Sequence, residues 1–168
     1  MKLSTNFSLS EFTASETAMK NGFAEQYNPP LEVVNNLKKL AENLAEPIRA
    51  KFGSFSPTVT YRCKRVNDKV GGASKSEHLR GQAFDETFIK DKVNISGQVF
   101  LWLLNSGLKW SKLIWEFGDE TNPRWLHIGY DETNLNNEVL IAKKNTFGKT
   151  IYINYKGSNL ETKHKQNA

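Results

Sequence analysis

Apolar residues recur every three or four positions between Pro30 and Phe52, which is the period of a helix with one buried face. The apolar positions are Val34, Leu37, Ala41, Leu44 and Ile48. Pro47 predicts a kink or a break in this helix, and Gly53 predicts its end. We therefore expect a long scaffold helix whose exposed face carries no chemistry.

Three further helices are indicated by their flanking residues. Ser8 and Glu11 form a capping-box pattern, which predicts a short helix to about Lys20. The segment 97–105 is apolar on most sides, with Ser96 as the expected N-cap, so a buried helix is predicted there. Residues 63–70 suggest another short helix, followed by a flexible Gly-rich connector at 71–74.

Alternating and β-branched or aromatic positions predict strands at 57–62, 82–88, 112–117 and 125–130. Segments 112–117 and 125–130 are joined by a short polar loop, which favours an antiparallel pair. A hairpin is expected from 139–142 and 150–155. These elements predict an α+β fold, a single domain over residues 1–155 with a central antiparallel sheet packed against helices. Residues 156–168 contain few apolar side chains and predict a disordered tail.

The composition limits which cellular location and which binding partners we expect for the protein. The chain has 168 residues, 38% of them hydrophobic, and a single cysteine, which excludes an internal disulfide. It has no apolar run of membrane-spanning length, and its first residues lack an apolar signal core. We expect a monomer made in the cytoplasm without a signal peptide. The net charge of +5 favours binding to anionic surfaces. The sequence contains no basic block interleaved with aromatic residues, which is the pattern that would predict a nucleic-acid partner.

Candidate metal ligands occur in the segment from Ser76 to Asp85. A neutral imidazole at His78 and a carboxylate at Asp85 are both good ligands for Zn²⁺. An extended chain would separate them by about 23 Å, on opposite faces. They can share one ion only if the chain turns between them, and Gly81 permits such a turn. The alternative is a surface loop followed by an edge strand with a solvated aspartate.

A second histidine lies in the aromatic strand at 125–130. His127 shares a face of this strand with Trp125 and Gly129. Antiparallel pairing with 112–117 could bring Glu116 near His127. A carboxylate within an apolar run is costly to bury without a partner, although an outward-facing glutamate on a half-exposed strand is the alternative.

Two other side chains could take part in chemistry. Arg62, at the end of the strand predicted at 57–62, presents a fork of donors that suits a carboxylate, although a structural salt bridge is the alternative. Cys63 suggests a Cys–His peptidase, but it would face away from Arg62 and lacks the sequence context of thiol peptidases. A small buried thiol fits Cys63 better. We assign no metal role to His164 in the tail.

The order and spacing of these residues match a known family. The pattern Ser76-x-His78-x-x-Gly81-x-Ala83-x-Asp85, followed by a glutamate and Trp125-x-His127, resembles the zinc D-Ala-D-Ala carboxypeptidases and L,D-/D,D-endopeptidases. These M15-type peptidoglycan peptidases include phage endolysins, and they share their zinc-site architecture with hedgehog signalling domains. The resemblance runs roughly from Phe7 to Tyr130.

This resemblance implies a role for each matching residue. His78, Asp85 and His127 would hold one Zn²⁺, and Glu116 would be the catalytic base. Arg62 would be a catalytic residue together with Glu116 and would also bind substrate, and Ser76 is expected to bind substrate as well. The sequence departs from the pattern in three places: Val59-Thr60 precede Tyr61 instead of Ser-Gly, Glu86 replaces an apolar residue, and Gly129 replaces a serine.

We therefore expect a zinc-dependent peptidoglycan peptidase that cleaves stem-peptide or cross-link amide bonds, with a Glu-activated zinc water as nucleophile. Its partners would be peptidoglycan stem peptides, with no nucleic acid and no membrane span. By resemblance to phage endolysins, it would act on the cell wall after phage-type release. One alternative is a non-catalytic, zinc-stabilised module that binds the cell wall. A basic nucleic-acid binder is a second alternative, and it would bind DNA in a salt-sensitive manner that is indifferent to chelator.

Overall fold

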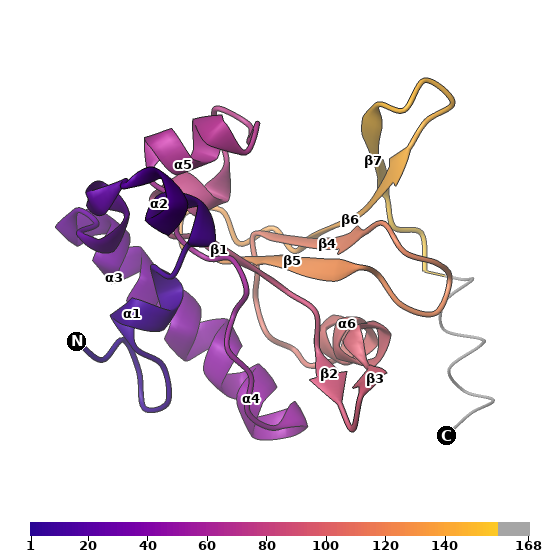
Figure 1. The fold of residues 1–168 in the computed structure, drawn as a ribbon. Helices are drawn as coiled ribbons and strands as arrows, with labels where there is room; N and C mark the ends of the chain where they lie inside the picture. The colour runs from indigo at the N-terminus through magenta and orange to yellow at the C-terminus, as the bar shows by residue number, and fades with distance from the viewer. Residues whose placement is uncertain (158–168) are drawn as a thin grey trace.

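Most helices gather on one side of the protein, beside a twisted five-stranded sheet (Figure 1). The computed structural model describes residues 1–157. The helices are α1 (Leu9–Phe12), α2 (Glu16–Asn21), α3 (Leu31–Leu40), α4 (Glu46–Phe52), α5 (Lys64–Lys69) and α6 (Ser96–Asn105), with 3-10 turns η1 (Ala24–Tyr27) and η3 (Glu77–Arg80) and the π turn η2 (Ala41–Ala45). The strands are β1 (Ala83–Glu86), β2 (Ile89–Lys90), β3 (Val93–Asn94), β4 (Lys112–Glu116), β5 (Trp125–Gly129), β6 (Glu138–Lys144) and β7 (Thr150–Asn154).

The first predicted helix is two short helices. Ser8 forms the expected capping box with Glu11, but α1 ends at Phe12. The Ser15 side chain accepts a hydrogen bond from the Ala18 backbone N–H and begins α2. The prediction of one helix to Lys20 was wrong because a second N-cap restarts the helix in a new direction.

The predicted scaffold helix is a continuous helical run from α3 through η2 to α4. All five of its expected apolar positions are buried. Pro47 lies in the first turn of α4, directly after the π turn. A proline has no N–H and its ring clashes with the preceding turn, so the wider π turn accommodates it without ending the helix. Gly53, with φ of 99°, terminates the run as predicted.

The sheet has the strand order β1-β5-β4-β6-β7 and is mixed. The antiparallel pairs β4–β5 and β6–β7 are confirmed, and β1 also pairs antiparallel with β5. The strands that carry the site pair antiparallel as expected, and the sheet departs from this pattern at one pair, because β6 runs parallel to β4. Strand β5 returns the chain to the starting end of β4, and residues 130–137 then carry it to the free edge of β4. The α+β fold itself is as expected.

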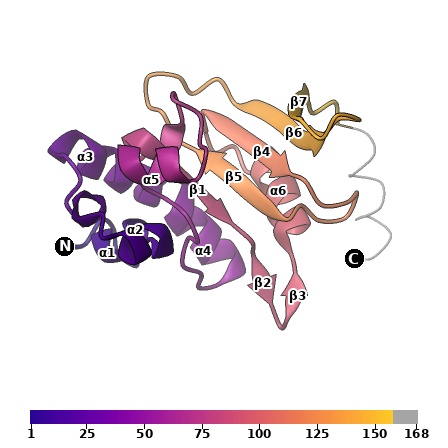
Figure 2. The ribbon, with the colours of Figure 1, turned by 45° about the horizontal axis from the view of Figure 1, so that its top comes forward.

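Alternation along the strands separates a core face from a polar face. Leu113, Trp115, Leu126 and Ile128 are buried, and the Trp115 ring meets the ring of Phe100 from α6 edge-on at 5.2 Å. Figure 2 shows α6 behind β4 and β5. The opposite face carries Ile114, Glu116, Trp125 and His127, which line a cleft. The sheet thus has one face for packing and one available for chemistry.

Two local predictions were wrong. Segment 57–62 forms only an isolated bridge between Val59 and Asp85, because the N–H groups of Tyr61 and Arg62 donate to the carbonyls of Phe12 and His78 instead of a strand partner. Ser96 is the first residue of α6 and not its N-cap. Its hydroxyl accepts a hydrogen bond from the Phe88 N–H, which links α6 to the segment between β1 and β2.

Within residues 1–157, no helix has both the length and the apolar character needed to cross a membrane. Most of the tail predicted to be disordered, together with His164, lies outside the described residues.

Candidate metal centre and active-site cleft

Strand register brings Asp85 and His127 together. They are direct partners across β1 and β5, and the Asp85 Oδ1 lies 2.9 Å from the His127 Nδ1. The third member, His78, comes from the η3 turn, and its Nε2 lies 3.2 Å from the Asp85 Oδ2. The two candidate histidines therefore converge on the carboxylate of Asp85.

The turn that delivers His78 depends on Gly81. This residue has φ of +65°, and a Cβ there would lie 2.9 Å from side-chain atoms of Leu37 and Val33 on α3. Glycine is thus needed both for the backbone conformation and for close packing on the scaffold helix. The predicted turn is confirmed. The η3 turn packs against α3, whereas a straight strand would have carried His78 away from Asp85.

The hydrogen bonds of the two histidines indicate which ring nitrogen of each one faces Asp85. The His78 Nδ1 lies 2.7 Å from the backbone carbonyl of Thr60. A carbonyl can only accept, so Nδ1 donates and the lone pair of Nε2 faces Asp85. In His127 the nitrogen facing Asp85 is Nδ1, and Nε2 points to the carboxylate of Glu77 at 2.9 Å.

Two imidazoles and a carboxylate form a donor set that suits zinc. One ligand atom from each of His78, Asp85 and His127 lies within 4.8 Å of the others. Each histidine donates its remaining ring N–H away from the shared centre, as metal-ligating histidines usually do. The residues present therefore fit a zinc ion held by three protein ligands.

The charges of Asp85, His127 and Glu77 lie in direct contact. Burial disfavours the charged form of His127, but hydrogen bonds and charges from Asp85 and Glu77 outweigh it and raise its pKa to about 9. Burial lowers the pKa of His78 against the pull of Asp85. The pKa of Asp85 is held well below its usual range, because both histidines outweigh the cost of its burial. At neutral pH His127 is therefore protonated and carries a positive charge next to the carboxylates of Asp85 and Glu77.

Glu116 lies at the end of β4 on the same sheet face. Glu116 is paired with Trp125 on β5. Ile114, which precedes Glu116 by two residues on β4, is paired with His127. Glu116 is 8% exposed, and burial together with the charge of Asp85 raises its pKa to about 7, against the opposing pull of His127. A carboxylate that titrates near neutral pH is suited to general-base chemistry. Glu116 and His127 line the same cleft, as expected from strand pairing.

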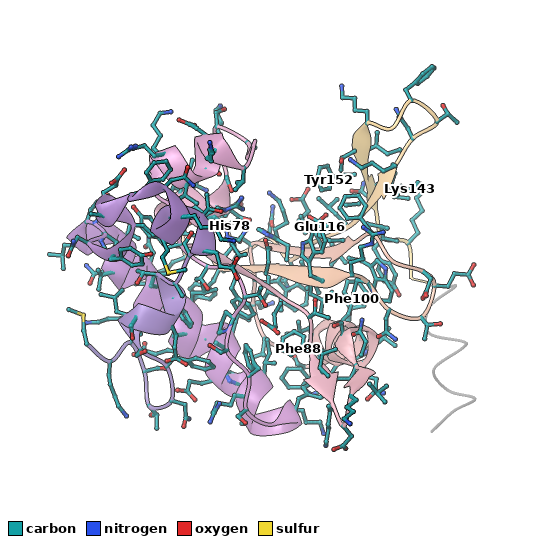
Figure 3. The ribbon with its side chains drawn as sticks, in the orientation of Figure 1. His78, Phe88, Phe100, Glu116, Lys143 and Tyr152 are labelled. Atoms are coloured by element: carbon teal, nitrogen blue, oxygen red, sulfur yellow. The ribbon has the colours of Figure 1, made fainter. Side chains whose placement is uncertain are left out.

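This cleft, of about 580 Å³, opens between the helical side and the β6–β7 hairpin. One wall comprises Arg62 and the connector 70–76, and the other comprises Leu140, Thr150 and Tyr152. In Figure 3, His78, Glu116 and Tyr152 lie along one side of the sheet, whereas Phe88 and Phe100 lie on the other. The candidate metal centre is therefore at the floor of an open groove that can admit an extended chain.

Arg62 and Ser76, the two expected substrate-binding residues, both lie in the cleft wall. The Arg62 Nε is buried and has no hydrogen-bond partner among residues 1–157. Burial lowers the pKa of this guanidinium, and the charge of Asp85 opposes that shift. An unpaired buried donor at the edge of a cleft can bind an acceptor from a ligand. The alternative of a structural salt bridge for Arg62 is not found within the described chain.

Sequence reasoning missed two cleft residues. Glu77 was passed over although it adjoins a candidate ligand, and an acidic residue beside a metal-binding histidine was a usable signal. Tyr152 lines the cleft because Ala142 is paired with both Glu116 and Tyr152, which places all three in one row on the polar face. That row depends on the parallel β4–β6 pair, which no pattern in the sequence indicates.

The remaining candidates lie away from this chemistry. Cys63 is buried, carries a free thiol and does not line the cleft, in agreement with the expected buried thiol. Glu86 follows Asp85 on β1 but points to the core face, where its carboxylate accepts hydrogen bonds from the backbone N–H and the hydroxyl of Thr58. At Gly129 a Cβ would lie 2.7 Å from the Ser111 Oγ and 2.9 Å from the Glu77 Oε2, so no side chain fits there without displacement.

Comparison with known families agrees with this geometry. The family model described as Peptidase M15 matches residues 5–100, more than half of the chain. The match includes Arg62, Ser76, His78 and Asp85, and it ends before Glu116 and His127. No curated protein matches the sequence. The family is generally zinc-dependent, consistent with a His–Asp–His group that could bind a metal. Through this match, the chain belongs to the peptidase M15 family.

Proposed function

We propose that the protein is a zinc-dependent peptidase that hydrolyses amide bonds in the stem peptides or cross-links of peptidoglycan. The observation that carries the proposal is the convergence of His78, Asp85 and His127 in a cleft that also holds Glu116. A purely structural metal site has no need of a buried carboxylate that titrates near neutral pH. The open groove also suits a peptide better than a small enclosed ligand.

His78, Asp85 and His127 would hold the ion, which when bound supplies Lewis-acid polarisation of a carbonyl and lowers the pKa of water. Glu116 accepts the proton of the attacking water as its oxygen bonds to the scissile carbonyl carbon. It then delivers that proton to the amine nitrogen as the C–N bond breaks. The products are a carboxylic acid and an amine, which at neutral pH become a carboxylate and an ammonium by transfer of the remaining water proton, and Glu116 returns to its ionised form.

Arg62 would orient the substrate by binding a carboxylate with its guanidinium. Stem peptides carry such carboxylates, and the net charge of +5 favours approach to an anionic wall. Ser76 lies on the same wall and can offer a hydroxyl to the substrate backbone. These groups position the peptide while Glu116 acts on the bond.

The proposal extends to the biological setting. A single buried cysteine with a free thiol fits a protein folded in a reducing compartment, and the protein would reach the wall by endolysin-like release. Purified protein added to whole cells with permeabilised outer layers would test this role. Lysis that requires the active-site residues supports it, and intact cells beside efficient cleavage of isolated wall contradict it.

The decisive experiment is mass spectrometry of purified peptidoglycan incubated with the protein, after chelation and again after zinc is restored. Peptide fragments that appear only with zinc support the proposal, and their masses identify the bond. The matched control is Glu116→Gln, which should bind zinc and release no fragments. Intact peptidoglycan that retains the protein in a zinc-dependent manner would instead favour a wall-binding module. Salt-sensitive DNA binding that ignores chelator would favour a nucleic-acid binder.

A further inference from the structure

The second ring nitrogen of His127 is bound to a buried carboxylate outside the candidate ligand set. Its Nε2 lies 2.9 Å from the Glu77 Oε2, on the side of the ring away from Asp85. Glu77 is 9% exposed and does not belong to the converging group of His78, Asp85 and His127. Its carboxylate therefore contacts a candidate ligand without joining the centre itself.

Glu77 is itself held in place by several contacts. Its second oxygen, Oε1, accepts a hydrogen bond of 2.8 Å from the hydroxyl of Ser111, which is 3% exposed and directly precedes β4. The Lys112 Nζ lies 4.0 Å from the Glu77 Oε2. The Glu77 carbonyl accepts a hydrogen bond from the Gln82 N–H, which closes the turn. A side chain fixed at both oxygens can orient its partner.

The space for this carboxylate is created by Gly129. A Cβ at that position would lie within 2.9 Å of the Glu77 Oε2 and within 2.7 Å of the Ser111 Oγ. Gly129 has no positive φ, so its small size is what the site uses. The residues Glu77, Ser111 and Gly129, from the η3 turn, the start of β4 and the end of β5, thus fit together behind His127.

The two candidate histidines are oriented by different groups. His78 donates Nδ1–H to a backbone carbonyl, which no side-chain substitution can remove, whereas the acceptor for His127 is a side chain. We propose that Glu77 is a positioning residue that accepts the Nε2–H of His127, so that Nδ1 faces the metal. This inference rests on the proposed function, because it assigns a role to Glu77 only in relation to a bound ion.

The test compares Glu77→Met with Glu77→Gln. Methionine has a similar length but offers no oxygen acceptor, whereas glutamine can accept from His127 and donate to Ser111. The zinc dissociation constant is measured by competition with a chelator, and the melting temperature of the zinc-free protein reports folding. Loss of such an outer partner typically weakens metal binding by roughly 10–100-fold. We expect that loss in Glu77→Met and substantial recovery in Glu77→Gln.

A second readout separates positioning from general stability. In zinc-loaded protein carrying His164→Gln, only His78 and His127 contribute imidazole N–H signals. The Nε2–H signal of His127 should be protected from exchange in wild type and Glu77→Gln and should exchange rapidly in Glu77→Met. The Nδ1–H signal of His78 is the internal reference. Glu42→Met, on the exposed side of the scaffold helix, controls for the substitution itself.

Two further variants keep the test decisive where Glu77→Met does not fold. Ser111→Ala removes one support of Glu77, and Gly129→Ala crowds its carboxylate, so both should weaken zinc binding in the same direction. Wild-type zinc affinity in all of these variants, or equal losses in Glu77→Gln and Glu77→Met, would overturn the role of Glu77. If the role of Glu77 is overturned but the wild-type protein binds zinc and cleaves peptidoglycan, the proposed function is unaffected. Failure of wild type to bind zinc overturns both.

Discussion

Asp85 and His127 are direct partners across β1 and β5, and the Asp85 Oδ1 lies 2.9 Å from the His127 Nδ1. The same ring is bound through Nε2 to Glu77, so a buried imidazole lies between two carboxylates. These anions raise the pKa of His127 to about 9 against the cost of burial. At neutral pH the imidazole of His127 is therefore protonated.

Zinc binding should release this proton. A ligating imidazole is neutral at the nitrogen that binds the ion, so zinc competes with the Nδ1 proton of His127. Below pH 9 the zinc affinity should fall by roughly tenfold per pH unit from this group alone. Calorimetry at pH 7.5 in two buffers with different ionisation enthalpies measures the number of protons released.

The matched pair for this measurement is His127→Ala and His164→Ala. Replacing His127 should lower the bound zinc, as measured by elemental analysis, whereas replacing His164 should leave stoichiometry and proton release unchanged. Full zinc occupancy in His127→Ala would remove that residue from the ligand set.

Glu116→Gln should keep zinc and lose turnover. Glutamine fills the same space but cannot accept the proton from water, and loss of a general base typically lowers kcat by roughly 10²–10⁴-fold. In the wild type, kcat/KM should fall as the pH drops below about 7, where the base becomes protonated. Stopped assays of fragment release across pH 5 to 9, with zinc content measured in parallel, check both statements. A Glu116→Gln enzyme with wild-type kcat would show that the base lies elsewhere.

The part of the site that could be predicted from sequence is the part encoded within short segments. His78, Gly81 and Asp85 lie in one run of ten residues, so a turn and two ligands could be inferred from spacing and chemistry alone. Pairing of the strands around Glu116 and His127 followed from their short connection. The α+β fold followed from helix and strand periodicities that are consistent with each other.

The parts that could not be predicted depend on contacts between distant segments. Segment 57–62 alternates like a strand, but its Tyr61 and Arg62 N–H groups bond to the carbonyls of Phe12 and His78. No local pattern reveals such partners. The parallel pairing of β6 with β4, which brings Tyr152 to the cleft, likewise depends on which sheet edge remains free. Glu77 lay within the motif, but its contact with His127 is defined only once both strands are in register.

Arg62→Ala should weaken substrate binding. Its buried Nε has no partner within residues 1–157, and a hydrogen bond to a charged group contributes about 1.5–3 kcal/mol, or roughly 10–100-fold in affinity. KM for a peptide with a free carboxylate should rise by that factor. Arg62→Lys keeps the charge without the planar fork, so it should recover only part of the loss. Arg65→Lys is the control, because Arg65 pairs with Glu25 and lies outside the cleft. An unchanged KM in Arg62→Ala would exclude a substrate contact.

Glu86→Gln should stabilise the zinc-free protein above neutral pH. Burial, with a smaller contribution from Asp85, raises the pKa of Glu86 to about 7, against the hydrogen bonds from Thr58. The folded state thus binds this proton more tightly than the unfolded state, whose carboxyl has the usual pKa of about 4.3. The free energy of unfolding therefore falls as the pH rises between these two values.

Denaturant unfolding of the zinc-free protein at pH 4.5 and pH 8 tests this sign. Glu86→Gln should gain on the order of 1–2 kcal/mol at pH 8 and little at pH 4.5. Glu32→Gln, on the exposed face of α3, should leave the free energy of unfolding unchanged at both values. Destabilisation by Glu86→Gln at pH 8 would mean that the ionised carboxylate is favoured by the fold.

Tyr152→Ala should lower kcat/KM for a peptide that extends across the groove, without changing zinc content. Tyr152 is in one row with Ala142 and Glu116 on the polar face, and Tyr152 and Glu116 both line the cleft. Tyr152 is 54% exposed and forms part of the cleft wall, so a bound peptide can cover it. Losing the contact of one aromatic ring should cost about tenfold in kcat/KM, or about 1.4 kcal/mol.

Two variants separate the contributions of Tyr152. Tyr152→Phe keeps the ring, so it should retain most activity if the contact is apolar and lose it if the hydroxyl binds the substrate. Phe147→Ala, at the exposed turn of the same hairpin and 91% exposed, should leave kcat/KM unchanged. A loss at Phe147 equal to that at Tyr152 would mean that the whole hairpin contacts the wall. Wild-type kcat/KM in Tyr152→Ala would mean that the substrate leaves the cleft before it reaches β7.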